Sequence, residues 1–207
     1  QLVMASVLAD IEMLASAGDF ASLARHCEAF ELDLRHTEEP QPVSVAVYKV
    51  HLLAYLLTEQ VDAARFLWKR MPAGTHALDP ELAAIWEVGK QMWQKQPAGV
   101  QAALRSVPWS QPLVASLAAR LQADTLQSSF KQMGAAYNTV AAPVLAQRLG
   151  VEEARVHELA AAAGWVASAE TGLYAPCAPA EDKQRTTGLE QLQALTEYVG
   201  AIEHEVR

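Results

Sequence analysis

The sequence is poor in cysteine, in β-branched residues and in long apolar runs, and each shortage excludes a class of protein. Its 207 residues include two cysteines, Cys27 and Cys177, which cannot form the disulfide framework of a small secreted domain. No apolar run approaches the ~18 residues that predict a membrane-spanning helix. Valine and isoleucine together number 21, against 39 alanines and 25 leucines. Because alanine and leucine favour helices, the composition predicts a mainly α-helical protein and excludes an all-β fold.

Basic residues are also scarce, and this shortage bears on possible partners. Lysine and arginine total 16 against 24 aspartates and glutamates, which gives a net charge of −8. Phosphate polymers and anionic membranes repel such a chain, so its charge argues against nucleic-acid and membrane binding. The two isolated cysteines are typical of reduced thiols, and we expect a cytoplasmic and nuclear protein.

Motifs for catalysis, cofactors and metals are missing. The sequence contains no Gly-rich phosphate or dinucleotide loop, no His-Glu-x-x-His and no Cys-x-x-Cys. Its histidines never occur two, three or four positions apart, so it lacks the His-x-His zinc pair of metal-dependent isopeptidases. His26 and Cys27 are adjacent and point in different directions on a helix, so we expect Cys27 to be a buried thiol. We therefore expect no enzyme activity, cofactor, metal or small-molecule ligand.

Residues 1–110 show helical periodicity interrupted by short turns. The turns carry glycine or proline, as at Gly18 and Pro72. They delimit the predicted helices, which are 2–16, 19–34, 43–57, 61–71, 80–95 and 98–106. The second helix of each pair begins near residues 19, 61 and 98, and this loose period is typical of helix-pair repeats. We predict a helical-repeat (helix-pair solenoid) domain over 1–110.

Tryptophans recur at helical spacing in this domain. In the helix that begins at Pro80, with Asp79 as its N-cap, Trp86 and Trp93 flank Gly89 on one face. A glycine at that place predicts the close approach of a neighbouring helix. An aromatic ligand pocket would use the same residue types, but stripes at helical spacing normally face a core. The residues that we assign to the structural core are Trp68, Trp86, Gly89, Trp93, Trp109 and Trp165.

Residues 111–177 have a different pattern, with one long helix, short helices and short strands. The elements expected in chain order are a helix at 112–135, a strand at 137–140, helices at 141–148 and 152–163, and a hairpin of 165–168 with 173–175. Gly164 follows the last helix as its C-terminal cap. This order of elements is that of a winged helix, so we predict a winged-helix subdomain over 111–177.

The second short helix of a winged helix often enters a DNA groove, but here its charge is wrong for that role. Between residues 151 and 177 there are four carboxylates and one arginine. Groove binding needs several cations that neutralise phosphates, so a protein-interaction module is favoured. Leu173 and Tyr174 lie in the second strand of the hairpin. We predict that this strand is an exposed edge to which a partner strand can add.

The C-terminal residues comprise a linker and one further helix. Residues 178–188 contain no large apolar side chain, so we predict an extended linker. In the helix predicted over 189–207, apolar residues recur at 3-4-3-4 spacing, and we call them the C-terminal stripe: Leu192, Leu195, Val199, Ile202 and Val206. Two heptads are too few for a helix that is stable by itself. We therefore predict that the stripe enters an intersubunit helical bundle.

Several segments resemble a known family. They are 63–72 (Ala-Ala-Arg-Phe-Leu-Trp-Lys-Arg-Met-Pro), 85–93 (Ile-Trp-Glu-Val-Gly-Lys-Gln-Met-Trp), Trp109-Ser110 and 192–199 (Leu-Gln-Ala-Leu-Thr-Glu-Tyr-Val). In order and spacing they are similar to the subunit eight family of the COP-nine signalosome, its smallest PCI-domain subunits. The resemblance extends from about residue 50 to the end of the sequence. The alanine-rich stretch 160–169 departs from the family texture.

The resemblance implies a PCI-type fold, in which a helical repeat precedes a winged helix. It implies membership of the complex that removes a ubiquitin-like modifier from cullins and so regulates cullin–RING ubiquitin ligases. It implies a non-catalytic scaffold, because in this family the isopeptidase is a different subunit, and signalosome subunit three is the expected neighbour. Two alternatives stay open. One is the small PCI subunit of the proteasome lid or of translation initiation factor three; the other, which the charge disfavours, is a winged-helix nucleic-acid binder.

Overall fold

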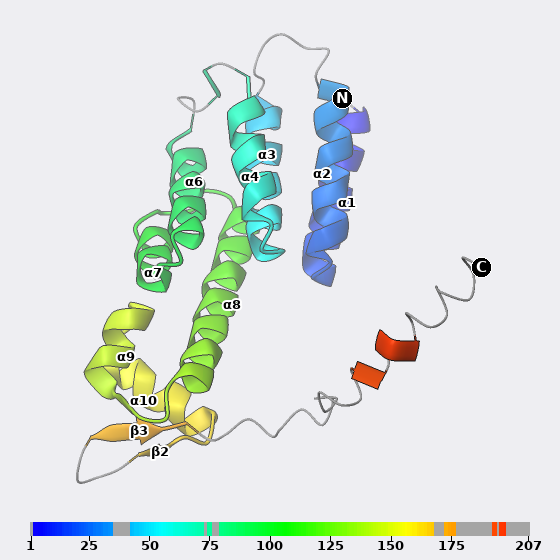
Figure 1. Cartoon of the computed structure of the whole chain (residues 1–207). Helices are drawn as coiled ribbons and strands as arrows, with labels where there is room; N and C mark the ends of the chain where they lie inside the picture. Colours follow the sequence, from blue (N-terminus) through cyan, green and yellow to red (C-terminus); the bar gives the residue numbers. More distant parts are fainter. Residues whose placement is uncertain are drawn as a thin grey trace.

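The computed structural model describes residues 2–34, 42–72, 74–75, 79–167, 172–176, 192–193 and 195–197. Within these residues the chain forms a row of helix pairs, and a long helix then leads into a small unit of helices and strands (Figure 1). The expectation of a mainly α-helical protein is confirmed. The predicted linker at 178–188 and most of the predicted C-terminal helix lie outside the described residues.

The row of helix pairs follows the predicted turns closely. The bounds are α1 (Leu2–Ala17), α2 (Phe20–Leu34), α3 (Pro42–Leu57), α4 (Val61–Arg70), α6 (Pro80–Trp93) and α7 (Pro97–Arg105). The pairs α1–α2, α3–α4 and α6–α7 stand side by side, with α3 in contact with α2, α4 and α6 (Figure 1). The second helices begin at residues 20, 61 and 97, so the predicted helix-pair repeat is confirmed.

Local signals explain where these helices begin and end. At the start of α6 the Asp79 carboxylate accepts a hydrogen bond from the Glu81 amide at 2.8 Å, and Pro80 occupies the first turn, as predicted. At the ends of α3 and α6, Glu59 and Lys95 adopt left-handed φ angles of 58° and 54°. Such φ angles are uncommon for residues with a side chain, and here they let the chain reverse between the helices of a pair.

The second part of the fold has the element order of a winged helix, as predicted. Its elements are α8 (Pro112–Ala136), β1 (Val140–Ala141), α9 (Ala142–Leu149), α10 (Glu153–Ala162), β2 (Val166–Ala167) and β3 (Leu173–Ala175). The antiparallel strands follow the order β1-β3-β2, with Val140 opposite Tyr174 and Val166 opposite Ala175. At the end of α10, the Trp165 amide donates a hydrogen bond to the Ala160 carbonyl at 2.9 Å. Gly164, just before Trp165, has a φ angle of 70°. Gly164 therefore ends this helix as expected.

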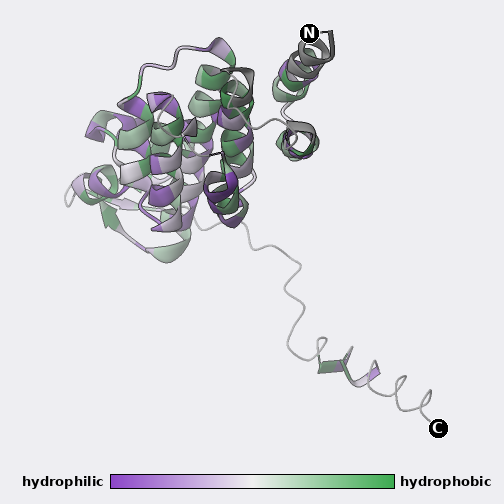
Figure 2. Cartoon of the chain, turned by 90° about the horizontal axis from the view of Figure 1, so that it is seen from above, coloured by the Kyte–Doolittle hydropathy of each residue, from purple (hydrophilic) through white to green (hydrophobic). Residues whose placement is uncertain are grey.

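Two hydrophobic cores divide the fold. The larger core joins the helix pairs to the first half of α8 and includes Leu53, Ile85 and Leu121. The smaller core joins the second half of α8, from Phe130, to the winged-helix elements. Seen from above, the helices of the body carry hydrophobic and hydrophilic residues on different faces (Figure 2). Because α8 contributes to both cores, the division falls within this helix; the boundary at 110 stays a sequence-based prediction.

Candidate protein-interaction site

The described cysteine is not placed for catalysis. Cys27 lies in α2 and is fully buried. Burial raises the pKa of its thiol to about 12, and the neighbouring Glu28 adds to this shift. A thiol in this environment stays protonated at neutral pH and is a poor nucleophile. Among the described residues no group of His, Cys, Asp and Glu side chains could hold a metal ion, and none of their helices could cross a membrane.

A polar network links α2, α3 and α4 inside the helical repeat. Arg70 donates two hydrogen bonds to the Glu31 carboxylate, at 2.6 and 2.7 Å, and Tyr55 donates one to Glu28 at 2.6 Å. His51 is fully buried beside them, and neither of its ring nitrogens has a hydrogen-bond partner among the residues that the structure describes. Burial lowers the pKa of His51 to about 4, and the nearby Glu31 offsets this only in part. The hydrogen bonds cross-link the three helices, and burial keeps His51 neutral near pH 7.

A second polar network ties α3 to the start of α6. The Lys49 ammonium group donates to Asp79 at 2.7 Å and to Glu81 at 2.8 Å. Glu81 also accepts a bond from the Ser110 amide at 2.5 Å. Burial alone would raise the pKa of Glu81, but these hydrogen bonds outweigh it and lower the pKa. The fully paired network fixes the packing of the helix pairs and leaves no carboxylate poised as a general base.

The tryptophans assigned to the core occupy its margin rather than its centre. Trp68 and Trp86 stack with ring centroids 5.4 Å apart, and both are half-buried. A Cβ on Gly89 would lie 3.5 Å from a methyl carbon of Leu56 on α3, so the predicted close approach of a helix is confirmed. Trp109 is half-buried against the larger core. Gly89 thus lies at a contact between helices. Trp68 and Trp109 pack against the outside of the larger core, and Trp86 stacks on Trp68.

Trp93 is the exception, and its assignment to the core is wrong. Its side chain is 52% exposed at the last residue of α6. The Arg65 guanidinium lies 5.5 Å from the centre of its ring, a cation–π contact at the surface. Helical spacing placed Trp93 on the correct face, but spacing does not indicate whether a neighbouring helix extends far enough to cover the end of α6.

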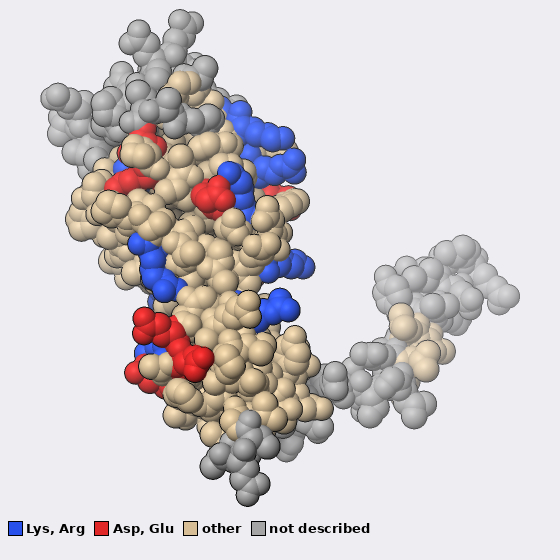
Figure 3. Space-filling view, turned by 90° about the vertical axis from the view of Figure 1, so that its left-hand side faces the viewer, with Lys and Arg blue, Asp and Glu red and all other residues tan. Residues whose placement is uncertain are grey.

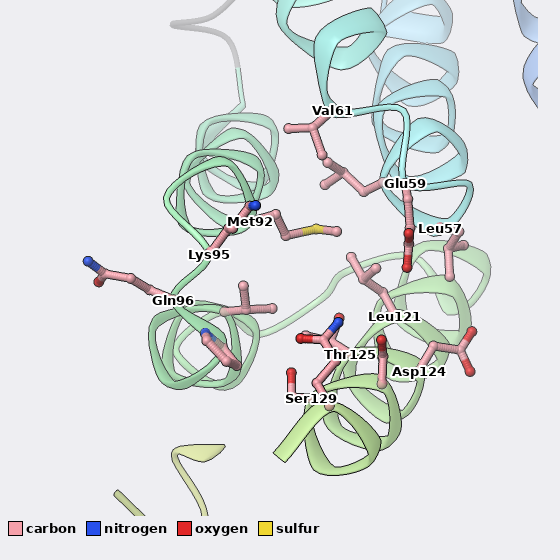
Figure 4. Close-up of a pocket in the computed structure, with 15 residues that line it drawn as sticks. Leu57, Glu59, Val61, Met92, Lys95, Gln96, Leu121, Asp124, Thr125 and Ser129 are labelled. Atoms are coloured by element: carbon pink, nitrogen blue, oxygen red, sulfur yellow. The ribbon is translucent and has the colours of Figure 1, made fainter. Parts of the chain in front are cut away.

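A hollow of about 360 Å³ lies where the turn after α3, the end of α6 and α8 meet (Figure 4). Apolar side chains such as Met92 and Leu121 line it together with the two left-handed residues, Glu59 and Lys95, and with Asp124. It therefore carries two carboxylates and one ammonium group. This mixture of charges favours no single class of ligand, and we assign no site to this hollow.

The winged-helix surface is acidic where a DNA-binding relative would be basic. Glu152, Glu153 and Glu158 are exposed on and beside α10, and Arg155 forms an ion pair with Glu158. Figure 3 shows carboxylates gathered on one side of the lower end of the molecule. Such a surface cannot neutralise several phosphates. The geometry of the described residues thus agrees with the charge argument for protein partners.

The predicted edge strand is not at the edge. β3, which contains Leu173 and Tyr174, pairs with β1 on one side and with β2 on the other. Tyr174 is only 6% exposed, and its hydroxyl contacts the ring of His157. The prediction of an edge at these two residues is therefore wrong, because β1 pairs with β3 on the side away from β2, with Val140 opposite Tyr174. Among the described strands the exposed apolar edge is β2, where Val166 is 68% exposed.

The C-terminal stripe is described only at its first two positions. Residues 192–193 and 195–197 are helical, and Leu192 and Leu195 are 62% and 60% exposed. The Thr196 hydroxyl donates to the Leu192 carbonyl at 2.8 Å, a helical i to i−4 contact. Val199, Ile202 and Val206 lie outside the described residues. The two leucines therefore face solvent, as a surface that awaits a partner would.

A row of helix pairs that ends in a winged helix defines the class of PCI-type proteins. The sequence profile of the CSN8/PSMD8/EIF3K family matches residues 42–186. The chain belongs to this family.

Curated relatives match almost the whole chain. COP9 signalosome complex subunit 8 of Arabidopsis thaliana is 30% identical over 203 residues, which covers 95% of this chain and 99% of the relative. The subunit 8 proteins of Xenopus laevis and Dictyostelium discoideum are 30% and 22% identical, over 95% and 94% of this chain and 99% and 96% of their own lengths. The similarity thus includes both the helical repeat and the C-terminal residues.

Proposed function

We propose that this chain is a non-catalytic scaffold subunit of a signalosome, in the position of subunit eight. The observation that carries the proposal is the full-length similarity to proteins named COP9 signalosome complex subunit 8. The complex removes the ubiquitin-like modifier from cullins and so regulates cullin–RING ubiquitin ligases, in the cytoplasm and the nucleus. The chain takes part as a structural component, and another subunit supplies the zinc-dependent isopeptidase.

Two surfaces are proposed to hold neighbouring subunits. The edge of β2 at Val166 adds a strand of a neighbour, for which subunit three is the expected candidate. The C-terminal stripe enters a helical bundle with other subunits. Burying one side chain of this size contributes roughly 1.5–3 kcal/mol, so five of them supply on the order of 8–15 kcal/mol before the cost of ordering the linker and the helix.

The family also supports a second candidate. Its profile covers small PCI subunits of the proteasome lid and of translation initiation factor three, and these share the same arrangement of helical repeat and winged helix. Residues 67–70 (Leu-Trp-Lys-Arg) resemble the signalosome member more closely. A nucleic-acid binder has no comparable support, because the net charge is −8 and the α10 surface is acidic.

Affinity purification of the full chain from native extract tests the proposal. We expect the other signalosome subunits in stoichiometric amounts, with subunit three retained longest as the salt concentration rises. Recovery of proteasome-lid or initiation-factor subunits instead would replace the proposal with the second candidate. The isolated chain should leave a modified cullin intact, and cleavage by the pure protein that a chelator abolishes would contradict the non-catalytic role.

A further inference from the structure

A groove between α8 and α10 has no role in the function proposed above. It measures about 570 Å³, and apolar side chains of Leu126, Phe130, Leu159 and Trp165 form its floor. The Trp165 ring stacks on Phe130, with centroids 4.3 Å apart. We call this feature the α8–α10 groove. It is large enough to receive several side chains of another molecule.

The floor of the groove depends on a glycine. A Cβ on Gly134 would lie 2.9 Å from a ring carbon of Trp165, closer than real Cβ contacts. Because that atom is absent, the indole ring can come close to the backbone of α8 and stack on Phe130. The ring stays half-buried and presents apolar surface to the groove. Gly134 therefore allows Trp165 to form part of the floor of the groove between α8 and α10.

The walls of the groove are built from small side chains. Four exposed alanines line it: Ala123 and Ala135 of α8, Ala162 of α10, and Ala163, which caps the end of α10. Alanines on both walls allow the backbone of a third helix to come close, since the distance between packed helices is set by the side chains at the contact. The alanine-rich stretch 160–169, which departs from the family texture, contributes one of these walls.

The charge at the groove is opposite to that of the molecule as a whole. Lys131 and Arg155 line it, and no carboxylate of the described residues does, although the chain carries a net charge of −8. Arg155 also pairs with Glu158, whereas Lys131 forms no ion pair with a described residue. An occupant that presents carboxylates on both flanks of an apolar face would complement these two cations.

We propose that the α8–α10 groove binds an amphipathic helix of a neighbouring subunit. Leucine-sized side chains of that helix enter between Phe130, Leu159 and Trp165, and its carboxylates face Lys131 and Arg155. The chain's own C-terminal helix is acidic and apolar too, but Leu192 and Leu195 are 62% and 60% exposed, so it does not occupy the groove here. The inference rests on the proposed membership of a multisubunit complex, because that complex supplies the helix.

Site-specific photo-crosslinking in the assembled complex tests the inference. The full chain would carry benzoylphenylalanine at Ala162 and be assembled with the other signalosome subunits. We expect an ultraviolet-induced crosslink to a segment of another subunit that is apolar on one face and rich in Asp or Glu. The control places the same residue at Ala154, which is also exposed on α10 but does not line the groove. It should crosslink at most at background level.

Three outcomes of this experiment would overturn the inference. Crosslinking at Ala162 no stronger than at Ala154 would mean that nothing enters the groove. A crosslink to residues 189–207 of the same chain would mean that its own helix fills the groove. In both cases the complex has formed and the proposed function stands. If the wild-type chain does not co-assemble with the subunits at all, the proposed function fails and the groove inference fails with it.

Substitutions give a second measurement. Trp165→Ala removes an aromatic ring from the floor of the groove, and Lys131→Glu with Arg155→Glu reverses its charge. We expect each variant to lower affinity for the partner subassembly by about tenfold or more, which corresponds to about 1.4 kcal/mol. The charge control is Lys69→Glu with Arg148→Glu, two exposed residues outside the groove. Circular dichroism would show that all variants are folded. Unchanged affinity of both groove variants would contradict the proposal.

Discussion

The backbone of Ala98 in α7 lies against Gly150, the residue that ends α9. A Cβ on Gly150 would be 2.7 Å from the Cα of Ala98, and the φ angle of Gly150 is 67°. Arg105 of α7 also donates a hydrogen bond to the Gly150 carbonyl. This contact joins the winged-helix unit to the last helix pair. It requires a glycine for two independent reasons, the left-handed backbone and the missing side chain.

Gly150→Ala should therefore lower the free energy of unfolding more than the same substitution at a glycine where only the left-handed backbone is unfavourable. A left-handed alanine costs about 1 kcal/mol, and forcing a methyl group against a fixed backbone adds about 1–3 kcal/mol. The matched control is Gly164→Ala, where φ is 70° and no atom lies within 4 Å of the added Cβ. Urea unfolding of both variants measures the difference. Equal losses in the free energy of unfolding would show that the backbone at Ala98 moves to accommodate the methyl group without cost.

His51→Leu should stabilise the protein in acid. The pKa of His51 falls from its ordinary 6.5 to about 4 in the folded chain. As the pH drops from 6.5 to 4 the unfolded chain therefore binds a proton that the folded chain does not, and the free energy of unfolding falls. The variant lacks this group, so its advantage over the wild type should grow by up to about 3 kcal/mol over that range.

Thermal or urea unfolding of both proteins between pH 7.5 and 4 measures this advantage. At pH 7.5 the variant should be no less stable than the wild type, because it removes two buried nitrogens that lack hydrogen-bond partners. Glu28 and Glu31, the carboxylates that act on His51, are present in both proteins, so their own contribution to the pH dependence cancels in the comparison. A difference between the two proteins that does not change with pH would refute the prediction.

Val166→Asp should weaken association with the neighbouring subunit and leave the fold intact. Val166 lies in the edge strand β2 and is 68% exposed, so the aspartate is well solvated in the free chain but is buried when a strand adds. Val144→Asp is the control, because Val144 is 47% exposed but lies on α9 and not in β2. Co-purification and circular dichroism measure the two effects. Equal retention of subunit three by both variants would exclude the β2 edge as the contact.

Leu195→Asp together with Ile202→Asp should reduce incorporation into the complex, because it places two charges in the C-terminal stripe. The thermal midpoint of the isolated chain should hardly move, since Leu195 is 60% exposed. The matched control is Ala194→Asp with Ala201→Asp, which adds the same charge at the same spacing but outside the stripe of the predicted helix. If the stripe variant melts much earlier yet assembles normally, the helix packs on its own chain.

Helix bounds and the order of elements could be predicted because their signals are local. Asp79 and Pro80 start α6 where the sequence indicated, and the left-handed Gly164 follows α10 as a cap. The role of Leu173 and Tyr174 could not be predicted, because it depends on whether β1 pairs with their strand across the intervening α9, α10 and β2. Trp93 illustrates the same limit. Periodicity gives the direction of a side chain but not the length of the helix beside it.

The sequence by itself determined a mainly helical chain with a repeat of helix pairs, a winged helix and an apolar stripe near its end. Propensity, turn residues and periodicity act over a few neighbouring residues, so they can be read without the fold. Only the tertiary structure decided that β2 is an exposed edge strand, that Trp93 is exposed, and that small residues on α8 and α10 form a groove with Lys131 and Arg155. These features arise where segments far apart in the sequence meet. Local propensities and periodicity do not specify such contacts.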